Sequence, residues 1–137
     1  MRRRKPYTHY FLLSKSKQPK PTLETYITEV CCERFGITRA QLKSKNRLRE
    51  VVLARQLAML VIHISGKSTT YAAGTFNRDH ATLLHGQKKI TELLETKYPR
   101  HDYDTVTQIL KRTAVLYKQV DLSRLQGKLQ GLEERIY

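Results

Sequence analysis

What this sequence of 137 residues lacks already narrows the kinds of protein it can encode. Tryptophan is absent, and the only two cysteines, Cys31 and Cys32, are adjacent. Adjacent cysteines match neither a disulfide framework nor the spaced ligand pairs of a zinc site, so we expect a reducing, cytoplasmic environment. No apolar run approaches the ~18 residues of a membrane span, and the apolar patch at 10–13 is too short for a signal peptide. We therefore expect neither a membrane segment nor a secretory leader.

Acidic residues are also scarce. The chain has 26 Lys and Arg against 12 Asp and Glu, for a formal net charge of +14. Such an excess favours a polyanionic partner, with nucleic acid first. On charge alone, a ribosomal or merely soluble basic protein remains the alternative. The length suits one domain with a modest core and tails.

We expect three parts: a basic N-terminal arm (1–21), a helical domain (22–113) and a C-terminal helical tail (114–137). The arm contains no acidic residue, and the mutual repulsion of its cations makes it a poor core element. It either remains a solubilising tail, or it follows phosphates or enters a minor groove.

Helical spacing of apolar residues and the capping signals predict an all-α fold. Thr22 and Ser68 are expected N-caps, and Asn77 is expected to cap the helix that follows it. Tyr71 and Leu84 are expected to face the core. The predicted helices span about 22–35, a short turn after Thr38, 49–64, 68–76, 78–96 and 103–120.

The C-terminal tail carries apolar residues at alternating spacings of three and four, as in a coiled-coil seam. Two glycines within it weaken a helix. The tail therefore either packs back on its own domain or offers a seam to a second copy or to a replication or regulatory protein. The seam residues are Leu122, Leu125, Leu129, Leu132 and Ile136.

Signals for nucleotide, metal and catalysis are incomplete. Residues 66–68 read Gly-Lys-Ser, like the end of a P-loop, but the glycine required five positions earlier is Val61. His80 and His85 are five apart, on different sides of a helix, and no further ligand completes a metal set. We therefore expect no metal, no cofactor and no enzymatic activity.

The segment from Arg78 to Thr82 carries groups that can read DNA at a helix N-terminus. Asp79 can accept a hydrogen bond from a cytosine amino group, His80 can bond to or pack on a base, and Ala81 can touch a thymine methyl. Thr82 can donate to phosphate. Alternatively, Asp79 merely favours the helix dipole; Arg78 and the basic loop at 45–49 favour the DNA interpretation.

Two further residues are ambiguous. We expect His85, one turn deeper and beside the apolar face, to be a structural histidine rather than a base reader. Arg55 is either a phosphate contact or a member of an intradomain ion pair.

Residues 22–113 resemble the C-terminal DNA-binding domain of DnaA, the bacterial chromosomal replication initiator. The Arg78-Asp79-His80 signature with an Arg-Gln helix upstream is specific, and the resemblance covers about two thirds of the chain. The matching segments are Ser44-Lys45-Asn46-Arg47-Leu48-Arg49, Ala54-Arg55-Gln56-Leu57-Ala58-Met59 and Arg78-Asp79-His80-Ala81-Thr82-Leu83-Leu84-His85.

The resemblance implies an all-α, helix-turn-helix domain that binds double-stranded DNA at the short asymmetric DnaA box, in replication control or transcription regulation. It places Asp79, His80 and Ala81 at major-groove positions, with Thr82 as a neighbouring contact. Arg47 matches the arginine that enters the minor groove. The positions where the family has basic, mostly backbone-contacting residues are Lys45, Arg49 and Arg55.

The sequence also departs from the family pattern. Ala81 stands where threonine is usual, which keeps a methyl contact but loses a hydroxyl. Asn77 stands where two glycines are common, and the segment near Gly66 is shorter. The ATPase module of DnaA is absent from this sequence, so we expect DNA recognition without ATP hydrolysis. The alternative is a non-specific nucleic-acid-binding or protein-interaction module that uses the arm and the C-terminal helix.

Overall fold

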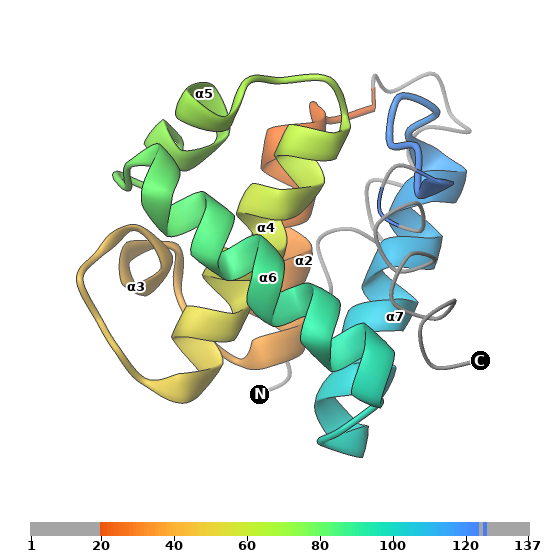
Figure 1. Ribbon diagram of the computed structural model, residues 1–137. Helices are drawn as coiled ribbons and strands as arrows, with labels where there is room; N and C mark the ends of the chain where they lie inside the picture. Colours follow the sequence, from red (N-terminus) through yellow and green to blue (C-terminus); the bar gives the residue numbers. More distant parts are fainter. Residues whose placement is uncertain (1–19, 124, 126–137) are drawn as a thin grey trace, which may run out of the picture.

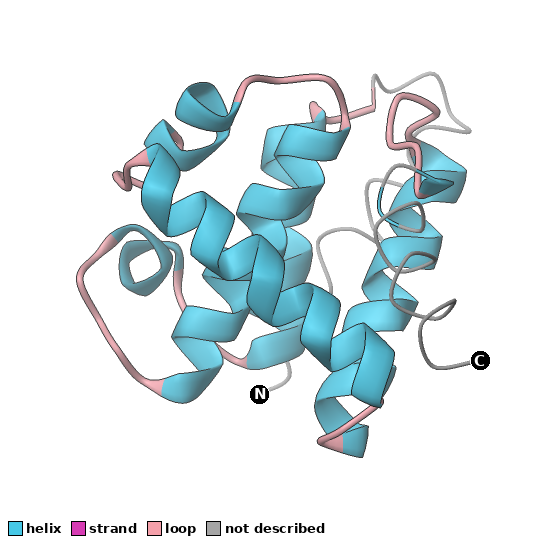
Figure 2. Ribbon diagram, viewed as in Figure 1, coloured by secondary structure: helices cyan, strands magenta, loops and turns pink. Residues whose placement is uncertain are grey.

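The computed structural model describes residues 20–123 and 125, and over these it contains six α-helices and no strand (Figure 2). The predicted all-α fold is therefore confirmed. The helices are α2 (Leu23–Phe35), α3 (Arg39–Lys43), α4 (Arg49–Ile64), α5 (Thr69–Gly74), α6 (His80–Thr96) and α7 (Arg100–Leu116).

Helix α4 is the central element. It packs against α2, α3, α5 and α6, and α6 crosses in front of it in Figure 1. Ten of its sixteen residues are buried, as expected for a helix covered on most sides. Only one of those ten, Arg55, carries a charge. Helices α5 and α6, joined by the turn at 75–79, form the helix-turn-helix unit.

Local capping chemistry begins three helices as predicted. The Thr22 hydroxyl accepts from the Thr25 amide at 3.2 Å, and the Ser68 hydroxyl accepts from the Tyr71 amide at 3.0 Å. Thr38 forms a capping box with Gln41, in which each side chain bonds to the other residue's backbone amide. Each of these capping bonds joins residues within one stretch of four, so it can be predicted from the sequence without knowledge of the tertiary structure.

The start of α6 differs from the prediction. Asn77 has a left-handed backbone (φ 59°), so it lies in the turn and cannot be the N-cap, which needs extended backbone. Asp79 takes that role with φ −98° and ψ 173°. Arg78 and Asp79 therefore precede α6 instead of forming its first turn.

Two residues expected in the core are exposed. Leu84 is 46% exposed, because neighbouring residues on a helix point about 100° apart and Leu83 occupies the inward position. Tyr71 is 49% exposed; its hydroxyl donates to Glu24 Oε2 at 2.9 Å, and Lys67 Nζ stands 5.2 Å from its ring.

Helix α7 begins at Arg100 and ends at Leu116, earlier at both ends than the predicted 103–120. Pro99 provides its N-cap, and the extended backbone of Tyr117 (φ −128°, ψ 104°) ends it. Tyr117 and Val120 nevertheless remain buried in the core beyond the helix.

The beginning of the described chain is fastened to the end of α7. Lys20 Nζ donates to the Leu116 carbonyl at 2.5 Å and stands 4.7 Å from the Tyr117 ring centre. The Tyr117 hydroxyl donates to the Pro21 carbonyl at 2.5 Å. These contacts hold Lys20 and Pro21 against the end of α7.

The predicted arm and tail are only partly within the described residues. Residues 1–19 lie outside them, as do Leu129, Leu132 and Ile136 of the tail seam. Leu122 and Leu125 pack on the core. The division at 21 and 113 stays a prediction, although the helix containing position 113 continues to Leu116.

Two further expectations concern the cysteines and a membrane span. Cys31 and Cys32 are both free thiols; Cys31 lies buried in the core, and burial raises the pKa of its thiol. Among the described residues, no helix has both the length and the apolar character to traverse a bilayer.

Candidate nucleic-acid interface

A surface hollow of about 820 Å³ lies between the segment at 45–47, helix α4 and the beginning of α6. It unites residues that are separated by up to forty positions in the sequence and that are predominantly polar or basic. Its lining consists of Lys45, Asn46, Arg47, Val52, Arg55, Gln56, Met59, Asn77, Arg78, Asp79, Thr82 and His85.

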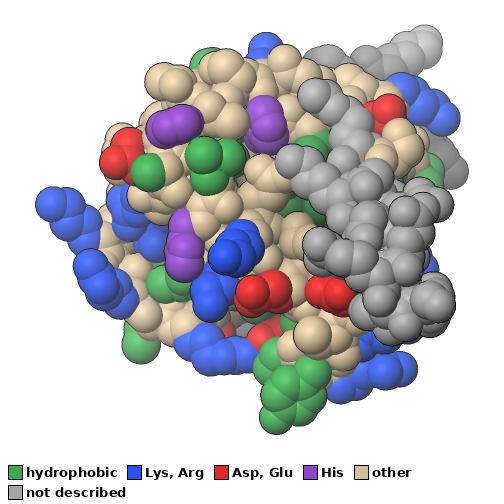
Figure 3. All heavy atoms as spheres, in the orientation of Figure 1, with side chains coloured by type: hydrophobic (Ala, Val, Ile, Leu, Met, Phe, Trp, Pro, Cys, Tyr) green, Lys and Arg blue, Asp and Glu red, His purple; other side chains and the backbone are tan. Residues whose placement is uncertain are grey.

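The loop on one side of the hollow is ordered by its own polar side chains. The Ser44 hydroxyl donates to the Gln41 carbonyl at 2.8 Å and accepts from the Asn46 amide at 3.0 Å. Asn46 Oδ1 accepts from the Leu48 amide at 2.8 Å, which is an Asx-type turn. Lys45 and Arg47 alternate with these residues and are exposed. Figure 3 shows Lys and Arg side chains gathered along this edge of the molecule.

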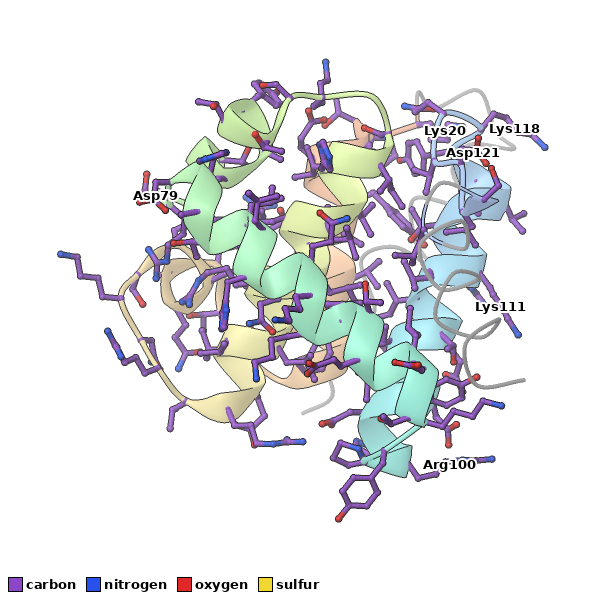
Figure 4. The ribbon with its side chains drawn as sticks, in the orientation of Figure 1. Lys20, Asp79, Arg100, Lys111, Lys118 and Asp121 are labelled. Carbon is purple, nitrogen blue, oxygen red and sulfur yellow. The ribbon has the colours of Figure 1, made fainter. Side chains whose placement is uncertain are left out.

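Asp79 stands at the opposite side of the hollow, at the N-terminus of α6 (Figure 4). Its Oδ1 accepts from the Thr82 amide at 3.0 Å and from the Thr82 hydroxyl at 2.8 Å. These hydrogen bonds, the amide's first, lower the pKa of the Asp79 carboxyl. The group is therefore an ionised acceptor at neutral pH, and its second oxygen can accept from a base amino group.

His80 and Ala81 follow as the first residues of α6, and both are exposed. His80 Nδ1 lies 3.4 Å from the Thr69 hydroxyl of α5. Thr82 is only partly exposed, and its hydroxyl proton is directed to Asp79. The Thr82 hydroxyl, which we expected to donate to phosphate, therefore donates to Asp79 within the helix cap.

Arg55 is placed differently from both sequence-based alternatives. It is 5% exposed, and its guanidinium donates to backbone carbonyls instead of a carboxylate. Nε bonds to Leu42 O at 2.8 Å, and Nη2 lies 3.1, 3.0 and 3.2 Å from the carbonyls of Gln41, Ser44 and Asn46. Burial first, and the neighbouring charge of Arg78 second, lower its pKa. The charged guanidinium therefore faces the carbonyls of residues 41–46.

Arg78 and Arg49 also have partners within the domain. Arg78 Nη2 donates to the Ser44 carbonyl, and Nη1 donates to Asn77 O at 3.2 Å. Arg49 pairs with Asp102 of α7, while its side chain stays 59% exposed. The Asp102 side chain is only 9% exposed, so loss of this pair would leave a buried carboxylate without its cation. Arg49 is therefore anchored to α7 while much of its own side chain faces solvent.

Four polar residues of the hollow were absent from the predicted site: Asn46, Gln56, Asn77 and His85. His85 is exposed, so its assignment as a structural histidine is wrong. Its spacing of three from Thr82 places both on one helix face, a signal that could have identified it. Gln56 is likewise four positions from Val52 and three from Met59, which share the lining.

Comparison with known proteins identifies relatives of the helix-turn-helix region. Residues 25–90 match the family model described as the bacterial DnaA protein helix-turn-helix. The chain is 36% identical over 92 residues to the chromosomal replication initiator protein DnaA of Bacteroides fragilis, covering 65% of this chain and 19% of that protein. It is 34% identical over 84 residues to DnaA of a Synechococcus, covering 60% and 18%. With DnaA of Herpetosiphon aurantiacus the identity is 30% over 102 residues, covering 72% and 21%. The chain thus spans about a fifth of the length of these relatives.

Proposed function

Because residues 25–90 match the family model of the bacterial DnaA helix-turn-helix, we propose that this protein binds duplex DNA sequence-specifically, at sites related to the DnaA box. The observation that carries this proposal is the hollow itself. An exposed basic loop with Arg47 forms one side of it, and the N-terminus of α6 with Asp79 forms the other.

The two sides suit the two grooves of DNA. Asp79 is an acceptor, so it favours a base edge that presents an amino group, which cytosine and adenine do in the major groove. His80 and Ala81 are exposed beside it, where a recognition helix contacts base edges with its first residues. Arg47 projects from a short loop and can enter the adjacent minor groove, where arginine is the favoured side chain.

The overall charge supplies the sequence-independent part of the affinity. A net charge of +14 attracts a polyanion, and exposed Lys45 and Arg49 flank the minor-groove residue. Binding of this kind would place the protein at the bacterial nucleoid. It would act in replication control or transcription regulation by occupying its sites, without chemistry of its own.

A second candidate function is non-specific nucleic-acid binding. The observation that favours it is the run of basic residues in 1–21, which contains no acid. The C-terminal segment offers a comparable alternative as a contact for a second copy or a regulatory protein. Neither of these two functions requires contacts to base edges. A measured preference for one DNA sequence over another therefore distinguishes them from the first proposal.

The experiment is a competition shift assay at about physiological salt, with a DnaA-box duplex and a scrambled duplex of equal length. Wild type should prefer the box. His80→Ala should lose discrimination at one or two base pairs, worth ~1–3 kcal/mol each. His101→Ala is the matched control, since His101 is exposed on α7 and does not line the hollow, and it should bind as wild type does. Equal affinity of the wild type for both duplexes would refute sequence specificity.

Deletion of residues 1–19 tests the second candidate directly. If the arm follows phosphates, its loss weakens all duplexes alike and reduces the salt slope by about 0.9 for each phosphate contact removed. If only this deletion changes binding, and His80→Ala does not, the protein is a non-specific binder.

A further inference from the structure

The segment that presents Arg47 is bound to the turn that precedes the recognition helix, and two arginines make the connection. We propose that Arg55 and Arg78 are positioning residues that hold the loop at 44–47 and the N-terminus of α6 at one fixed spacing before DNA binds. The inference rests on the proposed function for its consequence, and on hydrogen bonds in the DNA-free protein for its basis.

Arg55 forms the inner half of this connection. Its four carbonyl partners belong to residues 41–46, so the chain curves around the guanidinium. Two of them, Gln41 and Leu42, lie in the last turn of α3, where carbonyls lack helical partners and the helix dipole is negative. A buried cation is stable there because those dipoles replace its hydration. The side chain thereby fixes the path of the loop.

Arg78 and Asn77 form the outer half, from the turn before α6. Arg78 Nη2 donates to the same Ser44 carbonyl that Arg55 uses, so the two lone pairs of that oxygen serve both arginines. Asn77 Nδ2 donates to the Lys43 carbonyl at 3.2 Å. The left-handed backbone of Asn77 directs the turn toward the loop. Asp79 follows at once, so the base-reading group and the loop share one rigid support.

The geometry of these contacts requires arginine. A guanidinium presents donors in a planar fork, whereas a lysine ammonium is a single point that cannot reach carbonyls spread over six residues. The contacts also commit the Arg55 donors to the protein, which leaves DNA contact to exposed Lys45 and Arg47. A loop ordered in advance loses less conformational entropy on binding, so the fixed spacing raises affinity.

The first test measures the loop in DNA-free protein by amide hydrogen exchange. Asn46 and Leu48 amides, which bond to Ser44 and Asn46 side chains, report its order. Arg55→Lys should speed their exchange on the order of tenfold or more while amides in α2 remain protected. Arg39→Lys is the matched control, because Arg39 is exposed and pairs with Glu29, and it should leave both amides unchanged. Unchanged exchange in Arg55→Lys would overturn the proposal.

The second test is a double-mutant cycle for DNA affinity. Arg47→Ala should weaken binding to the DnaA-box duplex roughly ten- to hundredfold in wild type, but much less in the Arg55→Lys background, where the loop is already displaced. If Arg55 instead contacts phosphate directly, Arg55→Lys retains most of the affinity and the two effects are additive. Additivity would overturn the proposal.

Arg78→Lys removes the connection from the turn before α6, and it should change amide exchange and the double-mutant cycle in the same direction as Arg55→Lys. It replaces Arg55→Lys if that variant does not fold. Failure of the proposed function is distinguishable: a wild type that does not discriminate between duplexes refutes specificity, while the exchange experiment still decides whether the arginines position the loop.

Discussion

A single oxygen of Asp79 accepts both the backbone amide and the hydroxyl of Thr82, at 3.0 and 2.8 Å. The residue assigned to base reading therefore also begins the recognition helix. Its two roles have different chemical requirements: a cap needs any acceptor oxygen, whereas recognition of an amino group benefits from an acceptor-only carboxylate.

Asp79→Asn and Asp79→Ala should separate these roles. The Asn variant keeps a capping oxygen, so its melting temperature should stay near that of wild type while its base preference at one position relaxes, because an amide also donates. The Ala variant should have a lower melting temperature, and its base preference at that position should relax as well. Thermal melts and site selection from a random duplex library measure the two. Equal melting temperatures for all three proteins would show that the cap does not stabilise α6.

The pH dependence gives an independent reading of the same cap. The folded-state pKa of Asp79 is depressed, so its stabilising contribution is present above the unfolded value of about 4 and is lost as pH falls through the folded pKa. Asp79→Asn should therefore reduce the loss of stability on acidification. The difference in urea midpoint between the two proteins, measured from pH 6 down to about pH 3, tests this.

The parts of the fold that could be predicted from the sequence are those decided within a few residues. Thr22, Thr38 and Ser68 cap helices because each hydroxyl meets an amide three positions on. Periodicity likewise located the central helix, whose bounds Arg49–Ile64 agree with the prediction. Local chemistry was sufficient in both cases.

The interior partners of the basic residues could not be predicted in this way. Whether Arg55 meets phosphate, carboxylate or carbonyl depends on where residues 41–46 lie, which is set by packing of α3 against α4. Asn77 carries two compatible signals, N-cap and left-handed turn, and the contact with Lys43 selects the second. The candidate site was thus predicted as a set of exposed groups, but not as the loop-to-helix connection that arranges them.

The crossing of α4 and α6 depends on the small size of Gly86. A Cβ atom placed there would lie 2.9 Å from Gln56 Cγ and 3.2 Å from its Cβ. Gly86→Ala should therefore destabilise by about 1 kcal/mol, because an overpacking cost of ~1–3 kcal/mol exceeds the ~0.5–1 kcal/mol gained in helix propensity. Gln56 lines the hollow, so affinity for the selected site should also fall.

Gly74→Ala is the matched control for this substitution. Gly74 is also helical, and a Cβ atom added there would meet nothing within 4 Å, so alanine should stabilise by ~0.5–1 kcal/mol. Urea denaturation of both variants gives the comparison. A stabilising Gly86→Ala would show that Gln56 moves aside without cost and that the helices do not need this close approach.

The Tyr117 hydroxyl joins the end of α7 to the start of the described chain through its bond to Pro21 O. Tyr117→Phe keeps the ring, which packs 5.2 Å from Tyr26, and removes only this bond, so it should cost ~0.5–1.5 kcal/mol.

Burial raises the pKa of Tyr117 to about 12, above the unfolded value of about 10. The contribution of the Tyr117 hydroxyl to folding stability is therefore complete below pH 10 and is lost as pH rises toward 12. The stability difference between wild type and Tyr117→Phe, measured by urea denaturation at about pH 8 and pH 11.5, should shrink at the higher pH. A difference that is equal at both values would mean that the hydroxyl does not stabilise the fold through this contact, and that the start of the domain is held by the Lys20 contacts alone.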